Sequence, residues 1–571
     1  MNGMKLPYGH ANFEKIRTER YFYVDKTRYL EMLEQRPESS VIMLRSRRFG
    51  KSLFCSMLGW YYDRLHAGRF EELFGGTYIG AHPTPRRNTY MILSFNFSGI
   101  NTENLANAHD GFTREVRSRI RVFLHRYPEH FSQEEEQRII QQPRPNDMLR
   151  EFFAILESHG TGPCVYAIID EYDHFANNIL SQGKTMFKDL VKTDGYVRPF
   201  YESLKKGTET VVDRIFITGV LPVLLDSLTS GFNIGKNLST DVQFNEMFGF
   251  TEDEITPILD HLGEQVSREE VRTYYNGYQF SPYAEQTVYN SDMVLYYGTE
   301  YDPVHHRIKT MIDSNVVSDY RKIRVVLSIG DKAVEEETLT RIVKREDIVV
   351  NEITPLFILT QETEFLFDAK TLVSLLFYMG YLTIAGRRGS RISLKMPNLV
   401  LESLYLDYMQ HLLMRRAQIR IDDMIRDEMI SDLLDGKIDL LIELTEKMLK
   451  GLSNRDYQQF DEKYIKVVML SLLSNVNLYI PHSEYEVGAD GYVDLYLQAA
   501  FEPETSAHYF FELKYVKARA PKRTQESKEE EGRRELCTYL NTPTARRIPH
   551  LHAYLLVFRK DRCVRVISEG S

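Results

Sequence analysis

The chain has 571 residues, more than one hydrophobic core usually supports, so about two to three domains are expected. Hydrophobic residues make up 43% and charged residues 27% of the sequence, and this globular composition excludes a largely disordered or fibrous chain. The formal net charge of -10 provides no overall attraction to nucleic acid, so a nucleic-acid partner would need a local basic surface.

Cysteine usage and the polarity of the N-terminus indicate the compartment. The four cysteines are far apart and lack the spacing of a disulfide framework or a zinc site, which favours a reducing compartment. The first residues lead into polar sequence instead of an apolar signal segment. No stretch approaches the roughly 20 apolar residues that span a bilayer. We therefore expect a soluble, cytoplasmic protein without a membrane partner.

The first part of the chain has the pattern of an α/β domain. Apolar runs of strand length occur at residues 41–44, 90–97, 165–170 and 214–219, with longer helix-compatible stretches between them. This alternation predicts a mainly parallel sheet covered by helices, in a first domain at residues 1–300.

The rest of the chain is expected to form two further domains. Residues 301–455 have mostly helical character, and a helix followed by a β-hairpin at residues 372–396 indicates a winged-helix-like element. Strand patterns return in the last domain, residues 456–571, after a charged helical span. These strand patterns lie at residues 491–497, 509–514 and 552–558.

A phosphate-binding loop is indicated after the first strand. Such a loop needs backbone N–H groups around the anion, a lysine that reaches the β and γ oxygens, and a hydroxyl that ligates Mg²⁺. Gly50, Lys51 and Ser52 supply these groups directly before a helical pattern at residues 53–64. The usual motif GxxxxGK[ST] has glycine where this chain has Arg45, so a basic loop before a surface helix is the alternative.

An NTPase also needs a strand that ends in an acid for the Mg²⁺ shell, often followed by an acid that polarises the attacking water. Asp170 and Glu171 follow the strand pattern of residues 165–169 in this way. We expect Asp170 to hold magnesium together with Ser52, and Glu171 to act as the general base. The alternative is a solvated acidic pair at a strand end. Thr218 lies at the end of the next predicted strand. It could contact the γ-phosphate, or it could be an ordinary β-branched strand residue.

Acidic residues near the C-terminus lie in two successive strand patterns. Cleavage of a phosphodiester needs carboxylates that hold a metal ion against the phosphate, and a cation that stabilises the developing charge. Asp494 lies in the strand pattern of residues 491–497. Glu512 and Lys514 share one face of the next strand, because side chains alternate. A cross-strand salt-bridge ladder on a solvated face is the alternative.

With these motifs in place, the N-terminal half resembles the AAA-ATPase-like family that is commonly fused to a PD-(D/E)XK nuclease domain. In that family the phosphate loop likewise begins with arginine. The resemblance implies binding and hydrolysis of ATP with Mg²⁺. The segments that carry it are residues 23–27, 45–53, 169–173, 216–220, 248–251 and 275–278. The candidate ATP-binding residues are Arg45, Arg48, Gly50, Lys51, Ser52, Asp170 and Thr218.

The C-terminal strands resemble the PD-(D/E)XK nuclease core. This resemblance implies Asp494 and Glu512 as ligands of Mg²⁺ or Mn²⁺, and Lys514 as the catalytic cation. Glu484 or Glu486 could supply a further carboxylate upstream of these residues.

Two departures from the nuclease pattern leave a second function open. Tyr492 stands where the family's Gly-Arg-x-Asp turn has arginine, and residues 532–536 lack the glutamine usually found in the following helix. The first hypothesis is an ATP-regulated, metal-dependent nuclease that acts on DNA or RNA. The alternative is a nucleotide-switched binding protein whose nuclease-like domain docks nucleic acid or a protein partner without cleavage. Oligomerisation through a neighbour's arginine is left open.

Together, these features predict a multidomain α/β fold. It would contain a P-loop NTPase-like domain with a parallel sheet, a helical middle domain with a winged-helix-like element, and a C-terminal α/β domain like that of restriction endonucleases.

Overall fold

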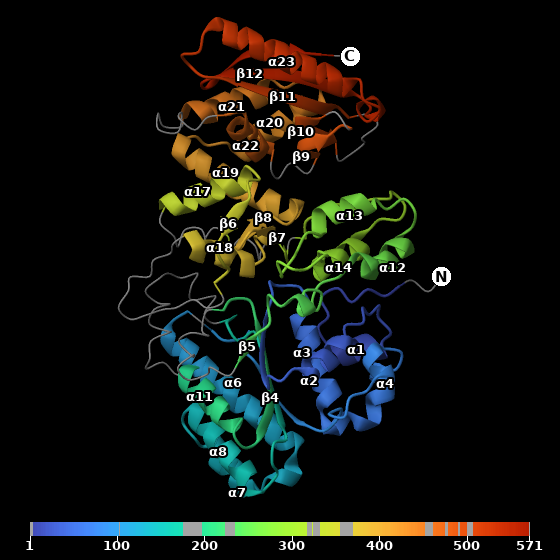
Figure 1. The fold of residues 1–571 in the computed structure, drawn as a ribbon, viewed down its shortest axis with the longest axis vertical. Coiled ribbons are helices and arrows are strands. Elements are labelled where there is room, and N and C mark those ends of the chain that lie inside the picture. The colour runs from blue at the N-terminus through green and yellow to red at the C-terminus, as the bar shows by residue number, and fades with distance from the viewer. Residues whose placement is uncertain are drawn as a thin grey trace. The chain divides into compact units, whose positions relative to one another are not determined.

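The structure is a computed structural model, and its described residues fall into two compact units (Figure 1). Unit 1 consists of residues 1–338 and 347–400, and unit 2 of residues 339–346 and 401–571, so the chain passes between the units three times. The predicted domain boundaries at residues 300 and 455 stay predictions. The described residues are 4–101, 103–174, 197–222, 235–313, 315–316, 323, 332–354, 369–451, 461–473, 478–488, 491–499 and 506–569.

A parallel sheet forms the centre of the described part of unit 1. Its strand order is β2-β3-β4-β1-β5, and every pair of neighbours is parallel. β1 and β3 are buried along their whole length, as expected for a parallel sheet between helices. The predicted strands and their parallel arrangement are therefore confirmed. The strands are β1 Ser40–Leu44, β2 Met91–Asn96, β3 Val165–Asp170, β4 Val212–Gly219 and β5 Lys236–Asn237.

Helices lie on both sides of this sheet (Figure 1). α3 begins directly after the predicted phosphate loop, with Gly50 as its N-cap at a left-handed φ of 91°. α12 begins with a capping box, in which Thr251 and Glu254 satisfy each other's backbone N–H groups. The helices are α1 Phe13–Thr18, α2 Arg28–Gln35, α3 Lys51–Tyr62, α4 Phe70–Phe74, α5 Tyr78–Ala81, α6 Leu105–Arg126, α7 Gln133–Ile140, α8 Pro145–Ser158, α11 Val197–Gly207, α12 Glu252–Leu262, α13 Arg268–Tyr275 and α14 Ser291–Glu300.

The later part of unit 1 contains the predicted helix and hairpin. α18 (Ala369–Tyr378) is followed by the antiparallel strands β7 (Thr383–Arg388) and β8 (Arg391–Lys395), and β6 (Ile348–Val350) pairs with β8. The predicted helix and hairpin are therefore confirmed, whereas their interpretation as a winged-helix-like element stays a prediction. Parts of the predicted helical middle lie outside the described residues, namely residues 314, 317–322, 324–331, 355–368 and 452–455.

Unit 2 is built on a mixed sheet with the order β13-β12-β11-β10-β9 in its described part. β11 and β12 are parallel, and the other neighbours are antiparallel. The three predicted strands correspond to β10, β11 and β12, whereas β9 and β13 were not predicted. The strands are β9 Tyr479–Glu486, β10 Tyr492–Ala499, β11 His508–Val516, β12 Leu551–Arg559 and β13 Arg562–Ser568.

Long helices accompany this sheet. α23 packs on β11 and β12 over an apolar layer that includes Phe510, Leu536 and Leu555. The described helices nowhere combine the length and apolar character needed to cross a bilayer. The helices of unit 2 are α20 Asp423–Leu434, α21 Asp439–Gly451, α22 Glu462–Leu473 and α23 Lys522–Leu540, while α17 Lys332–Val343 and α19 Leu399–Ala417 contain residues of both units.

The backbone at Gly277 allows a test of the packing in unit 1. Gly277 has a left-handed φ of 101°, and a Cβ atom placed there would lie 2.1 Å from the carbonyl oxygen of Pro397. Gly160 also has a left-handed φ, of 66°, but has open space around it. We expect Gly160→Ala to cost about 1–2 kcal/mol of folding free energy, the price of the left-handed conformation alone. Gly277→Ala should cost clearly more, because the loop must also move.

Urea unfolding of both variants, followed by near-ultraviolet circular dichroism, measures this difference. Equal midpoints for the two variants would show that the contact between Gly277 and Pro397 is absent in solution.

Candidate functional sites

A cavity of about 540 Å³ lies at the start of α3 in unit 1. Its wall includes Gly50, Lys51 and Ser52 of the predicted phosphate loop, and Glu171 beyond the end of β3. This volume is in the range of sites that bind small molecules and cofactors. Other parts of the wall come from sequence-distant segments within residues 7–11, 22–26, 247–250 and 291–295.

Ser52 and Asp170 form the polar contact that joins α3 to the end of β3. The Ser52 hydroxyl donates to Oδ2 of Asp170 at 2.6 Å, and Nδ2 of Asn96 lies 3.3 Å from the same oxygen. Burial raises the pKa of Asp170. A hydroxyl and a buried carboxylate side by side suit a hard cation such as Mg²⁺, whose charge would favour the ionised carboxylate. The residues present therefore fit the metal ion of a nucleotide.

The lysine of the loop points into the loop itself. Nζ of Lys51 donates to the carbonyl oxygen of Ser46 at 2.9 Å, and burial lowers the pKa of the ammonium group. Arg48 has a left-handed φ of 66° and forms an ion pair with Asp292. Both basic residues line the cavity together with the acidic residues Asp292 and Glu171, so the loop contributes positive charge to one part of its wall.

Glu171 is held by the histidine three residues later. Nδ1 of His174 lies 3.0 Å from Oε2 of Glu171, and this hydrogen bond lowers the pKa of the carboxyl group. Glu171 has a φ of 51°, an uncommon conformation for a residue with a side chain. Both residues line the cavity. A charged carboxylate fixed at the cavity wall has the protonation state in which it can accept a proton.

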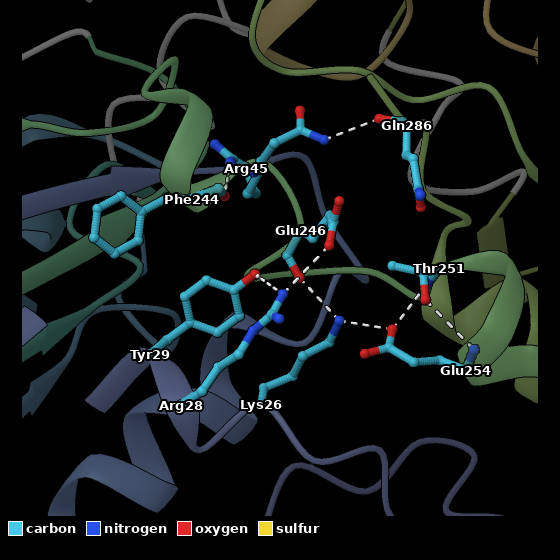
Figure 2. Close-up of polar contacts among 10 residues, drawn as sticks. Lys26, Arg28, Tyr29, Arg45, Phe244, Glu246, Thr251, Glu254 and Gln286 are labelled. Atoms are coloured by element: carbon cyan, nitrogen blue, oxygen red, sulfur yellow. Dashed lines mark hydrogen bonds and ion pairs between the residues drawn. The ribbon is translucent and has the colours of Figure 1, made fainter. Parts of the chain in front are cut away.

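The side chains of Arg45 and Thr218 form hydrogen bonds with backbone carbonyls. The guanidinium group of Arg45 donates to the carbonyl oxygens of Leu44, Ser239 and Phe244, at 2.9, 2.6 and 2.8 Å. Figure 2 shows the contact with Phe244. The Thr218 hydroxyl donates to the carbonyl oxygen of Met43 at 2.9 Å. Neither residue lines the cavity. Asp170 does not line it either, but it contacts the lining residue Ser52. We therefore assign neither Arg45 nor Thr218 a nucleotide contact.

The guanidinium group of Arg45 also lies 4.1 Å from the centre of the Phe280 ring. Burial lowers the pKa of Arg45 to about 9, which is still high enough to keep the group charged at neutral pH. Arginine at the start of the loop thus fastens β1 to the segment at residues 239–244, a function that glycine cannot perform.

Lys26 connects the cavity wall to α12. Its ammonium group donates to the carbonyl oxygen of Glu246 at 2.9 Å and to the carboxylate of Glu254 at 2.7 Å (Figure 2). Asp25 accepts from the backbone N–H groups of Thr27 and Tyr78. The sequence pattern alone predicted no role for either residue. Asp25 has a local partner in Thr27, but its other partner Tyr78 and the Lys26 partner Glu254 lie far away in the chain.

In unit 2, a row of carboxylates crosses three neighbouring strands. Leu495 pairs with Phe511, so Asp494 of β10 lies beside Glu512 of β11. Leu495 also pairs with Ser483, so Glu484 of β9 lies beside Asp494 on the other side. Burial raises the pKa of Glu512 to about 8, and the neighbouring charge of Asp494 contributes to this rise. The predicted approach of Asp494 and Glu512 is therefore present.

Lys514 lies between two carboxylates. Its ammonium group is 2.6 Å from Oε1 of Glu512 and 2.7 Å from Oε2 of Glu535, which belongs to α23. Although burial opposes it, these two charges hold the pKa of Lys514 above its usual value. The sequence did not predict a role for Glu535. The nuclease pattern has a glutamine in this part of the helix, and Glu535 lies within residues 532–536, where that glutamine was expected.

The carboxylates fit a divalent ion only in part. Among the described residues, no three His, Cys, Asp or Glu side chains converge closely enough to hold a metal ion alone. The buried Oε2 of Glu512 has no hydrogen-bond partner, and so it offers an oxygen that a cation would satisfy. Mg²⁺ is commonly held by one or two carboxylates with water and substrate phosphate as further ligands. Asp494 and Glu512 fit that kind of site.

The role of Arg45 can be tested by stability. Arg45→Met removes the donors from three backbone carbonyls, and we expect it to lower the free energy of unfolding by about 2–5 kcal/mol. Arg114→Met, an exposed arginine in α6, is the matched control and should change stability little. Urea unfolding of both variants without nucleotide provides the comparison. Normal stability of Arg45→Met together with weakened ATP binding would instead favour the nucleotide contact.

Two separate parts of the chain match known protein families. Residues 7–229 match the sequence model of a family described as predicted AAA-ATPase, and residues 460–567 match the PD-(D/E)XK nuclease superfamily. Both resemblances inferred from the sequence are thereby confirmed.

Individual relatives are distant. Over 300 residues the chain is 28% identical to an uncharacterised protein of the vnfD 5' region of Azotobacter chroococcum mcd 1. That match covers 52% of each protein, so the chain spans about half the length of this relative. A Walker-type ATPase of Pyrococcus abyssi superposes with a TM-score of 0.34 and 12% identity, over 71% of this chain and 98% of that one.

The chain therefore contains a predicted AAA-ATPase domain at residues 7–229 and a domain of the PD-(D/E)XK nuclease superfamily at residues 460–567.

Proposed function

We propose that unit 1 binds and hydrolyses ATP, and that its nucleotide state controls metal-dependent cleavage of a nucleic-acid backbone by unit 2. The observation that carries the ATPase assignment is the 2.6 Å contact between Ser52 and Asp170 beside the cavity. It brings the hydroxyl of the phosphate loop and the acid of β3 to one point. Lys51 and Glu171 line the same cavity.

Each residue of this cavity has a distinct task in the proposed hydrolysis. Lys51 would exchange the Ser46 carbonyl for a phosphate oxygen, and the first backbone N–H groups of α3 would bind the same anion. Ser52 and Asp170 would hold the Mg²⁺ that accompanies ATP. Glu171 would orient the attacking water and accept its proton, with His174 keeping the carboxylate in place.

The proposed cleavage in unit 2 rests on Asp494, Glu512 and Lys514. The two carboxylates would hold Mg²⁺ or Mn²⁺, which supplies Lewis-acid activation of a phosphate. Lys514 would keep Glu512 in position and offer positive charge to the phosphate as negative charge develops there. The basic and acidic groups needed for this chemistry are therefore supplied by neighbouring strands of one sheet.

Control of unit 2 by nucleotide would be carried by the chain connections. The short segment of residues 339–346 belongs to unit 2, while the residues on both sides of it belong to unit 1. A change of nucleotide in unit 1 would thus act on unit 2 through three covalent crossings instead of one. Order and disorder of nucleotide-contacting loops is a common way in which NTPases produce such changes.

A second function is favoured by the environment of Lys514. Its ammonium group is already paired with Glu512 and Glu535, and Tyr492, where the family has arginine, is 58% exposed. A site with its catalytic cation engaged in this way could dock nucleic acid or a protein partner without cutting it. ATP turnover with metal-dependent binding but without cleavage would favour this second function.

ATP binding depends on Lys51. We expect Lys51→Ala to weaken ATP binding by about 10- to 100-fold, because a charge-assisted hydrogen bond to phosphate is lost. Lys206→Ala, which removes an exposed lysine from α11, should leave the affinity unchanged. Isothermal titration of ATP with Mg²⁺ measures both. As a companion variant, Glu171→Gln should bind ATP normally and hydrolyse it at least about 100-fold more slowly. Equal affinities of Lys51→Ala and the unaltered protein would refute this site.

Cleavage depends on Asp494. We expect Asp494→Asn to reduce Mg²⁺- or Mn²⁺-dependent cleavage of labelled DNA or RNA by at least about 100-fold, because a metal ligand loses its charge. Asp423→Asn alters an acid of α20 that is 94% exposed and should cleave normally. The assays are run with and without ATP, so that control by nucleotide appears as a difference in rate. Undiminished cleavage by Asp494→Asn would exclude this carboxylate from the site.

A further inference from the structure

A second lysine lies inside the C-terminal site, and the sequence around it is unusual. Lys466 is the only charged residue between Ile465 and Leu473, a stretch of α22 that is buried throughout. Its side chain is only 7% exposed. Burial of an ammonium group in apolar surroundings is costly unless the charge is paired, and such lysines are uncommon. The position of Lys466 therefore calls for an explanation beyond helix packing.

The partners of Lys466 belong to the row of carboxylates. Its ammonium group is 2.9 Å from Oε1 of Glu484 and 3.8 Å from Oδ1 of Asp494. Lys514 pairs with Glu512 at the other end of the row. The row of acids thus has one buried lysine at each end, although the sequence pattern predicted only Lys514.

The two lysines differ in how firmly they are held. Lys514 is fixed by Glu512, whose side chain is 4% exposed. Lys466 is held by Glu484, whose side chain is 46% exposed and whose φ of 53° is left-handed within a strand. An uncommon backbone conformation of this kind is often found at functional positions. The Glu484 carboxylate can turn into water, so Lys466 has a partner that can release it.

A divalent ion on Asp494 would change the surroundings of Lys466. Because the ammonium group and the metal ion carry the same sign, the 3.8 Å contact between Lys466 and Asp494 becomes unfavourable once Asp494 ligates a metal. Lys466 must then be compensated by Glu484 or by a new anion. In a nuclease site, the anion brought in by the substrate is a backbone phosphate.

We propose that Lys466 is a second phosphate-binding cation of the C-terminal site. In the absence of nucleic acid it is paired with Glu484. It binds a phosphate oxygen of the nucleic-acid backbone on the β9 side of the metal, opposite to Lys514. This inference rests on the function proposed for unit 2 and extends it. Lys466 then binds substrate. Glu484 is the ion-pair partner that Lys466 exchanges for the phosphate, and it is not a metal ligand.

The first experiment measures binding without cleavage. The full chain and its Lys466→Met variant are titrated into labelled single-stranded DNA, duplex DNA and RNA of one sequence, in Ca²⁺, over a series of salt concentrations. Loss of one phosphate contact reduces the slope of log affinity against log salt by about one. Lys463→Met is the matched control, since Lys463 is an exposed lysine on the same helix. We expect the reduced slope only for Lys466→Met, and the wild-type slope for Lys466→Arg.

A second measurement separates phosphate binding from a purely structural role. Mn²⁺ binding to the full chain is followed by electron paramagnetic resonance without nucleic acid. Removal of a positive charge next to Asp494 should tighten Mn²⁺ binding several-fold in Lys466→Met, whereas loss of a merely structural lysine would weaken it by disordering the carboxylates. Glu484→Gln should bind nucleic acid more tightly with an unchanged salt slope, and it serves as the test if Lys466→Met fails to fold.

The outcomes distinguish this inference from the function on which it rests. Metal-dependent nucleic-acid binding with the same salt slope in Lys466→Met, or weaker binding by Glu484→Gln, overturns the role of Lys466 and leaves the proposed nuclease site intact. Absence of nucleic-acid binding by the unaltered protein in every metal overturns both.

Discussion

Charge that is removed from water must be compensated inside the protein, and this constraint shapes both candidate sites. Lys51, Asp170, Glu512 and Lys514 are all nearly buried, and each lies against a group of opposite charge or a directed dipole. An isolated buried charge would cost several kcal/mol or lose its ionisation. The side chains are therefore held in fixed places before any ligand binds, which is the preorganisation that binding and catalysis require.

Arg45 shows how the same constraint organises the surroundings of the phosphate loop. Its buried guanidinium group needs acceptors in several directions, and the carbonyl oxygens of Ser239 and Phe244 provide two of them. The segment that supplies these carbonyls continues into Phe248 and Gly249, which line the cavity. Arg45, which departs from the glycine of the usual motif, thus positions a sequence-distant segment of the cavity wall. The backbone of the loop still closes around the cavity because Gly50 takes the left-handed conformation.

The sequence predicted those features that depend on local pattern and strand direction. The parallel sheet, the helix after Gly50 and the meeting of Ser52 with Asp170 follow from alternating apolar runs, because parallel strands end at one edge. The hydrogen bonds of Arg45 could not be predicted in this way, because its acceptors are backbone carbonyls, which residues of any type could supply. Lys466 is recognisable in the sequence as a single charged residue in an apolar helix. Its contacts with Glu484 and Asp494 could not be predicted, because they depend on the pairing of β9 with β10 and β9 has a polar sequence.

The charge balance of the C-terminal cluster bears on the divalent ion that we propose for it. Four carboxylates, those of Glu484, Asp494, Glu512 and Glu535, surround the two ammonium groups of Lys466 and Lys514, which leaves two formal negative charges. The raised pKa of Glu512, about 8, shows one way to relieve this excess, by uptake of a proton. A divalent ion would relieve it more completely, and it would displace that proton. A proton and the proposed metal ion would therefore compete for the same carboxylate, and the excess of negative charge left by the two lysines would match about one divalent ion.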